Sequence, residues 1–306
     1  MEQQTLPLEL NFQGVRIIDT FAEAFPITGA RVIVTAVNRD WVQKAAITAT
    51  GHASSVIGCD TEAGIEKFLA CDETPDGRPG CSLLFFAFSR DSLQKALISR
   101  VGQSILTCPT TAVYNGFPVD PSRKIQIGGS LRFFGDGNQI SKLLDGRRYW
   151  RIPVMDGEFV CEDVFGTFKG VAGGNILILG KNSDSALKAA ELAVEAARSV
   201  EGVILPFPGG IVRSGSKVGS KYKKLKASTN DAFCPTLRAN GKTELGSGVG
   251  AVYEIVIDGV DRDAVENSMR KALKAACVDG IVAISAGNYG GKLGPVHIRL
   301  HDLIKS

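Results

Sequence analysis

The hydrophobic pattern of the chain alternates short apolar runs with amphipathic stretches. Apolar side chains recur every three or four residues after Asp40 and after Asp91, which is typical of helices with one buried face, and an aspartate can cap each of them. Apolar, β-branched runs predict strands at 30–37, 55–59 and 81–88. The first half of the chain is therefore predicted to alternate strands with helices.

The second half of the chain repeats this pattern. Two gapless shifts, of 144 and then of 172 residues, place similar strands and helices on one another. The matched segments are 30–37 with 174–181, 40–56 with 184–200, and 91–101 with 263–273. The identities are few, but their order indicates an internal duplication. The 28 additional residues must then form an insert at about 205–248.

Each half has the element order β-α-β-β-α-β, the split-βαβ or ferredoxin-like pattern. This order predicts an antiparallel four-stranded sheet with two helices on one face. We therefore expect an α+β protein of two duplicated ferredoxin-like lobes. The first lobe is expected over 1–157 and the second, which carries the insert, over 158–306.

One charged residue interrupts the apolar strand predicted over 251–258. Side chains alternate along a strand, so Glu254 shares a face with Val252 and Val256. If that face is covered, the carboxyl group loses hydration and its pKa rises, and a neutral acid can donate a hydrogen bond or a proton. The alternative, which the strand by itself favours, is an edge glutamate that points into water. The repeat sets Glu254 on Ser82, which weakens this alternative because the fold then requires no carboxylate there.

Composition narrows the class of protein. The 306 residues are 44% hydrophobic and 22% charged, as in ordinary folded proteins, and a net charge of +3 is too small to indicate a nucleic-acid partner. The seven cysteines show no CxxC spacing and the three histidines are distant from them, so no metal site is predicted. The N-terminus does not resemble a signal peptide, and no apolar run is long enough to span a membrane. We expect a cytoplasmic protein with free thiols.

The segment 206–226 is basic and rich in glycine. It contains no acidic residue, and its cations are Arg213, Lys217, Lys221, Lys223, Lys224 and Lys226. Such a loop suits an anionic ligand, although a solvated lysine face is an equally good interpretation. It is not a phosphate loop, because the order Ser216-Lys217 reverses the required Lys-[Ser/Thr].

Two cysteines, Cys108 and Cys234, are each followed by Pro-Thr and are candidates for a nucleophile. The sequence places no histidine beside either of them, so inert thiols are the favoured interpretation and a covalent acyl-enzyme is disfavoured.

Several segments carry a family resemblance. They are DTFAEAFP (19–26), ATGHASSVIGCDTEAGIE (49–66), ETPDGRPG (73–80), CPTTAVYNG (108–116), PFPGGIVRSGSKVGSKY (206–222) and AVYEIVIDG (251–259). From about Gly14 to its C-terminus the chain resembles the formylmethanofuran:tetrahydromethanopterin formyltransferases. The resemblance implies two ferredoxin-like lobes, which would be proximal over 1–157 and distal over 158–306.

The resemblance also implies an activity and a site. Members transfer a formyl group reversibly between methanofuran and N5 of tetrahydromethanopterin or its dephospho variant, with no metal or prosthetic group. The formyl group passes directly between these cosubstrates through a tetrahedral intermediate. Glu254 falls on the catalytic glutamate. The residues expected to bind substrate are Asp76, Arg78, Arg213, Ser216, Lys217, Lys221, Tyr253 and Asn288.

The resemblance implies partners as well. Members are homo-oligomers, dimers or tetramers, with the substrate cleft at a subunit interface. The slightly basic pI of about 8.4 is closer to the bacterial, methylotroph-type subunit of a formyltransferase/hydrolase complex than to the acidic proteins of methanogens. Two alternatives are a non-catalytic subunit of such a complex and an RNA-binding module. The second is disfavoured because LLFFAF lacks the basic and glycine residues that precede an RNP1-type motif.

Overall fold

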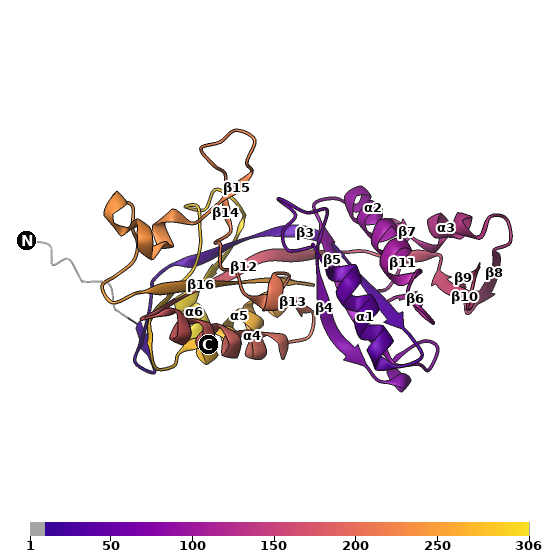
Figure 1. The fold of residues 1–306 in the computed structure, drawn as a ribbon, viewed down its shortest axis with the longest axis horizontal. Helices are drawn as coiled ribbons and strands as arrows, with labels where there is room; N and C mark the ends of the chain where they lie inside the picture. Colours follow the sequence, from indigo (N-terminus) through magenta and orange to yellow (C-terminus); the bar gives the residue numbers. More distant parts are fainter. Residues whose placement is uncertain (1–9, 306) are drawn as a thin grey trace, which may run out of the picture. The chain divides into compact units, whose positions relative to one another are not determined.

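The computed structural model describes residues 10–305, and these residues form two compact units. Unit 1 combines the N-terminal segment up to Pro26 with the chain from Val171 onward, and unit 2 spans Ile27–Gly170. The chain enters unit 2 within strand β3 (Phe21–Thr35) and leaves it within β12 (Phe168–Gly180) (Figure 1). The boundary between lobes that we expected at residues 157 and 158 was placed from the sequence repeat, whereas the two units are defined by compactness. The expected boundary stays a prediction.

Unit 2 has the predicted β-α-β-β-α-β order. Its elements are β3, α1 (Arg39–Thr50), β4 (Glu62–Leu69), β5 (Gly80–Ala87), α2 (Arg90–Arg100) and β6 (Ala112–Asn115). The strands pair in the order β6-β3-β5-β4, and every pair is antiparallel. Alternate residues of β3 and β5 pack with the apolar sides of both helices in one core. This arrangement confirms the ferredoxin-like prediction for this half of the chain.

Two local predictions in unit 2 are corrected. Helices α1 and α2 are capped by Asn38 and Ser89, whose side chains accept backbone N–H groups, whereas Asp40 and Asp91 lie within the first turns. The strand predicted at 55–59 is a turn, because the amides of Gly58 and Cys59 both bond to the carbonyl of Ser55. The strand that pairs with β5 is β4, which begins at Glu62.

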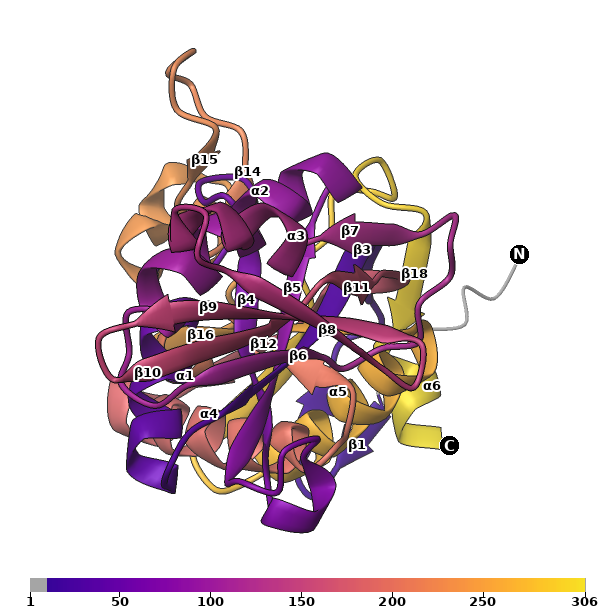
Figure 2. The same cartoon turned by 90° about the vertical axis from the view of Figure 1, so that its right-hand side faces the viewer.

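Unit 2 continues into a second set of short elements. They are β7 (Lys124–Gln126), α3 (Gly128–Leu131), β8 (Ile140–Leu144), β9 (Arg147–Val154), β10 (Gly157–Glu162) and β11 (Val164–Gly166). Strand β10 pairs in parallel with β6, and β9 and β8 follow it in antiparallel pairs (Figure 2).

Unit 1 has the same order of elements. They are β12, α4 (Ser183–Arg198), β13 (Val203–Ile204), β16 (Ala251–Gly259), α5 (Arg262–Ala276) and β17 (Ile281–Ser285). The strands pair as β17-β12-β16-β13, again antiparallel. Unit 1 also contains β1 (Leu10–Phe12), β2 (Val15–Ile17), β18 (Val296–Arg299) and α6 (Leu300–Lys305). Alanines of α4 and α5 pack against isoleucines of β12 and β16 on one face of the sheet.

The strand registers confirm the repeat in detail. In unit 2, Ser82 of β5 lies opposite Ile33 of β3, and in unit 1, Glu254 of β16 lies opposite Leu177 of β12. The two shifts read from the sequence map Ile33 onto Leu177 and Ser82 onto Glu254. The duplicated fold therefore places Glu254 and Ser82 at equivalent positions of the two sheets.

The segment between β13 and β16 covers the sheet face that the helices of unit 1 leave open. Its short elements are the 3-10 turns Pro208–Gly210, Asp231–Phe233 and Pro235–Asn240 and the two-stranded ribbon of β14 (Lys217–Val218) and β15 (Ala227–Ser228). Leu245 and Val249 pack on Leu177 and Leu179 beneath it. The loop between β14 and β15 extends away from the rest of unit 1 (Figures 1 and 2).

None of the helices within residues 10–305 is long and apolar enough to cross a membrane.

The glycine before the strand of Glu254 makes a close backbone contact. The amide of Gly250 donates to the carbonyl of Gly180 at 2.8 Å, and a Cβ on Gly250 would lie 2.2 Å from the carbonyl oxygen of Lys181. We predict that Gly250→Ala lowers the free energy of unfolding by about 1–3 kcal/mol, because backbone must shift to admit the methyl group. Gly58→Ala is the control, since a Cβ there meets nothing within 4 Å. Equal thermal stability of the two variants would contradict this packing.

Candidate functional site

Glu254 lies in the middle of β16, with its side chain on the face opposite the helices. Its residue is 4% exposed, so the prediction of a covered face is confirmed and the water-facing alternative is wrong. The backbone is held on both sides. Leu177 is its partner on β12, and its own N–H and C=O exchange hydrogen bonds of 3.0 and 2.7 Å with Val212.

The carboxyl group of Glu254 is incompletely satisfied. The hydroxyl of Ser216 donates to Oε1 at 2.6 Å, whereas Oε2 has no hydrogen-bond partner among residues 10–305. Burial raises the pKa of Glu254 to about 7, although hydrogen bonds from Ser216 oppose the rise. A substantial fraction of Glu254 is therefore neutral at neutral pH, as the apolar strand predicts.

A small cavity adjoins this carboxyl group. Its volume is about 30 Å³, and Glu254 lines it together with Leu177, Val212, Arg213, Ser214, Gly215, Asn230, Phe233, Cys234 and Val252. This is room for about one water molecule. Cys234 is half-buried at its wall, with its thiol 3.3 Å from the hydroxyl of Thr229.

The same sheet face in unit 2 shows why Glu254 is unusual. There Arg31 donates two hydrogen bonds, of 2.8 and 2.6 Å, to the buried carboxylate of Glu66, and Ser82 donates a third. The repeat maps Arg31 onto Asn175. The amide of Asn175 bonds the backbone of Gly287 and carries no charge. Unit 1 thus places a buried carboxyl group on this face without the arginine that balances one in unit 2.

The other predicted residues of unit 1 are not all beside Glu254. Ser216 bonds it directly and Arg213 lines its cavity. Lys217 forms an ion pair with Asp231 at 2.5 Å, and Lys221 is exposed in the loop between β14 and β15. Tyr253 faces the helix side of the sheet, where its hydroxyl lies 3.3 Å from that of Ser183.

Asn288 belongs to the glycine-rich loop that follows β17. Its amide donates to the hydroxyl of Thr20 at 2.9 Å, so its contacts in unit 1 are with the start of β3.

Asp76 and Arg78 lie in unit 2, where they bind each other. Arg78 donates to Asp76 at 2.8 Å and to the hydroxyl of Thr35 at 3.0 Å. The hydroxyls of Thr35 and Tyr114 both donate to the same oxygen of Asp76. A network of polar contacts therefore joins the ETPDGRPG segment to β3 and β6, and the role of this segment in substrate binding stays a prediction.

Sequence reasoning missed two residues of unit 1. Glu23 of β3 is 3% exposed and accepts backbone N–H groups of Tyr289, Gly291, Leu293 and Gly294. Tyr289 in turn bonds the backbone beside Ser216. The only signal for Glu23 is the one that identified Glu254, an acid inside an apolar strand.

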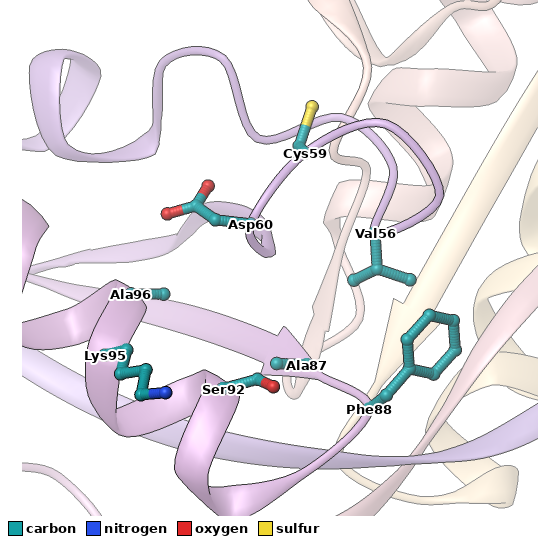
Figure 3. A pocket seen from close by; sticks show the side chains of 8 residues that line it. All are labelled: Val56, Cys59, Asp60, Ala87, Phe88, Ser92, Lys95 and Ala96. Carbon is teal, nitrogen blue, oxygen red and sulfur yellow. The ribbon is translucent and has the colours of Figure 1, made fainter. Parts of the chain in front are cut away.

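A larger cavity lies in unit 2 and contains none of the predicted site residues. Its volume is about 410 Å³, and Figure 3 shows its lining side chains, with Lys95 and Ser92 of α2 on one side and Cys59 and Asp60 on the other. Asp60 is bound to Arg100 at 2.6 Å, which lowers the pKa of Asp60 against the effect of burial. This cavity offers no unpaired acid comparable to Glu254.

Two family models match nearly the whole chain. Residues 10–154 match the model described as formylmethanofuran-tetrahydromethanopterin formyltransferase, and residues 157–303 match the model of its proximal lobe. The family model thus gives the name proximal lobe to the C-terminal half of the chain, whereas we had expected this name for the N-terminal half.

Individual proteins are similar over the same span. The chain is 54% identical to a formylmethanofuran–tetrahydromethanopterin formyltransferase of Methylobacillus flagellatus, with 95% of this chain and 98% of the relative covered. It is 52% identical to a protein of Methylorubrum extorquens that is named as a subunit of the formyltransferase/hydrolase complex, with 97% and 98% covered.

A solved structure agrees with these matches. The crystal structure of the formyltransferase/hydrolase complex FhcABCD of Methylorubrum extorquens with methylofuran contains a chain that superimposes with a TM-score of 0.93. That chain is 51% identical, and the match covers 97% of this chain and 99% of the other. This chain belongs to the formylmethanofuran–tetrahydromethanopterin formyltransferase family.

Proposed function

We propose that the protein transfers a formyl group between methanofuran and N5 of tetrahydromethanopterin, and that Glu254 is its catalytic acid. One observation carries the assignment of the acid: a buried carboxyl group with one free oxygen and a pKa of about 7. Relatives that bear this activity in their names are about half identical to the chain over nearly all of it. A subunit that had lost the chemistry would have no need to keep this carboxyl group without a cation.

The chemistry needs such an acid. In the direction from methanofuran, the lone pair of N5 attacks the formyl carbon and the carbonyl oxygen takes up negative charge. Collapse of this tetrahedral intermediate breaks the bond to the methanofuran nitrogen, which leaves poorly unless it gains a proton. Neutral Glu254 hydrogen-bonds the oxyanion and then gives its proton to the departing amine. The proton released by N5 restores the acid.

The hydrogen bond from Ser216 assigns different tasks to the two carboxyl oxygens. Because the hydroxyl of Ser216 donates to Oε1, the acidic proton of Glu254 resides on Oε2. Oε2 is the oxygen without a partner among the described residues, and it is the one we assign to the substrate.

The lysines between β14 and β15 suit the anionic end of a carrier. Lys221, Lys223, Lys224 and Lys226 lie together in this loop. Of the cationic side chains of segment 206–226, Lys217 forms an ion pair, and the others have none among residues 10–305. We assign the loop, with Arg213, to a polycarboxylate tail such as the glutamates of methanofuran. Asp76, Arg78, Tyr253 and Asn288 are proposed to contact the cosubstrates, with no resident metal or prosthetic group.

The proposed setting follows from the relatives. One of them is named as part of a formyltransferase/hydrolase complex, so we propose that this chain also assembles with other subunits. We further propose that the protein is a homo-oligomer whose substrate cleft lies at a subunit interface. Its proposed location is the cytoplasm.

We predict that Glu254→Gln lowers kcat by a factor on the order of 10²–10⁴ and leaves KM nearly unchanged, because the amide cannot transfer a proton. A spectroscopic assay of formyl transfer with the purified protein measures both constants. Glu244→Gln, an exposed glutamate of the same covering segment, is the control. Full activity of Glu254→Gln would rule out the proposed acid.

The rate is predicted to depend on pH through Glu254. Its pKa is raised from 4.5 to about 7, so the neutral, active form is lost as pH rises through about 7. The stability that proton binding to Glu254 contributes is complete below pH 4.5 and is lost as pH rises from 4.5 to about 7. We expect kcat/KM for formylmethanofuran to fall above pH 7, and a profile that stays flat from pH 6 to 9 would contradict this.

The lysine loop provides a further prediction. Lys221→Ala/Lys223→Ala/Lys224→Ala is expected to raise KM for methanofuran roughly tenfold and to weaken its salt dependence, because three screened attractions are removed. The matched control is Lys142→Ala/Lys188→Ala/Lys305→Ala, which removes the same charge from exposed sites elsewhere. Unchanged KM values for both cosubstrates would refute the assignment of this loop.

A further inference from the structure

The phenol of Tyr289 joins two backbone groups next to the proposed acid. Its oxygen accepts the N–H of Val218 at 2.8 Å and donates to the carbonyl of Ser216 at 3.2 Å. Both groups belong to the start of the β14–β15 ribbon. Tyr289 therefore holds the backbone on either side of Lys217. One of the two residues that it holds is Ser216, whose hydroxyl bonds Glu254.

Tyr289 is itself fixed by Glu23. The carboxylate accepts the N–H of Tyr289 at 2.7 Å, of Gly291 at 3.1 Å and of Gly294 at 2.8 Å, together with that of Leu293. Burial opposes the ionised form of Glu23, but these four backbone donors outweigh it and lower its pKa. A charged acceptor at neutral pH thus organises the loop that carries Tyr289.

The ribbon needs this external support. Strands β14 and β15 have two residues each and pair through Lys217 with Ser228 and Val218 with Ala227, and beyond them the amide of Gly219 donates to the carbonyl of Lys226 at 2.8 Å. An isolated pair of such short strands has little stability in water. The contacts from Glu23 to Tyr289, from Tyr289 to the ribbon and from Ser216 to Glu254 form one continuous path within unit 1.

We propose that Tyr289 is a positioning residue for formyl transfer, which acts by holding Ser216 so that its hydroxyl orients the carboxyl group of Glu254. The proposal rests on the proposed function. If Ser216 moves, Oε1 loses its donor and the carboxyl group can rotate, so Oε2 is no longer aimed at one place. Displacements of about 1 Å near reacting atoms can cost on the order of 10²-fold in rate.

The phenol is suited to this task at neutral pH. Burial raises the pKa of Tyr289 and the N–H of Val218 opposes the rise, whereas the charge of Glu23, and that of Glu254 once it is ionised at higher pH, raise it further. The hydroxyl therefore keeps its proton and can donate to the carbonyl of Ser216 while it accepts from Val218.

A double-mutant cycle tests the path. Tyr289→Phe is expected to lower kcat roughly tenfold with little change in KM, and Ser216→Ala to lower it at least as much. In the Ser216→Ala background, Tyr289→Phe should have no further effect, because the two residues act as a unit. Independent effects that multiply would assign Tyr289 a general structural role and overturn the proposal, as would wild-type kcat in Tyr289→Phe.

Amide hydrogen exchange provides a readout that does not depend on activity. In Tyr289→Phe the amide of Val218 loses its acceptor, so its exchange should become at least tenfold faster, while amides of β12 in the same unit stay protected. Tyr149→Phe in unit 2 is the matched control and should leave Val218 unchanged. Unaltered protection of Val218 in Tyr289→Phe would overturn the positioning role. A wild-type protein without formyl transfer would instead refute the proposed function, and the exchange result would still stand.

Discussion

The structure of the site depends on the burial of one carboxyl group without a cation. Glu254 is covered by the segment between β13 and β16, it receives a single side-chain hydrogen bond, and its other oxygen has no partner among the described residues. Charging a group in such surroundings costs free energy, so its proton is held to about pH 7. Val212 and Phe233 line the small cavity beside this carboxyl group, and the hydrogen bond from Ser216 opposes part of the rise in its pKa.

The duplicated fold separates the framework from the chemistry. Both units place strands in the same order and register, and each buries a carboxyl group on the sheet face away from its helices. In unit 2, Arg31 neutralises Glu66, and the result is an ion pair inside a stable sheet. In unit 1, a neutral asparagine occupies the equivalent position, and the carboxyl group is left as an acid. The proposed chemistry therefore depends on a few side chains that the common fold does not require.

Much of the fold and the position of Glu254 could be predicted from the sequence, because both are reported by patterns among residues that are close together in the chain. Alternation along 251–258 identified the face of Glu254, and the repeat predicted both sheets and the position of the insert. Caps were less certain, since Asn38 and Asp40 are both good capping residues and only backbone geometry separates them. Glu23 and Tyr289 were missed because they are 266 residues apart, and no local pattern reports such a contact. The ion pair of Lys217 with Asp231 likewise depends on how the insert folds.

The titration of Glu254 itself shows whether this carboxyl group is neutral at neutral pH. Carbon-13 NMR of protein labelled at the glutamate carboxyl groups, with the Glu254→Gln variant used to assign the resonance, reports its protonation without reference to any substrate. Because of its burial, Glu254 is expected to titrate with a midpoint near pH 7. A midpoint near 4.5, the ordinary value for glutamate, would show that Glu254 is ionised at neutral pH and would contradict its role as the acid.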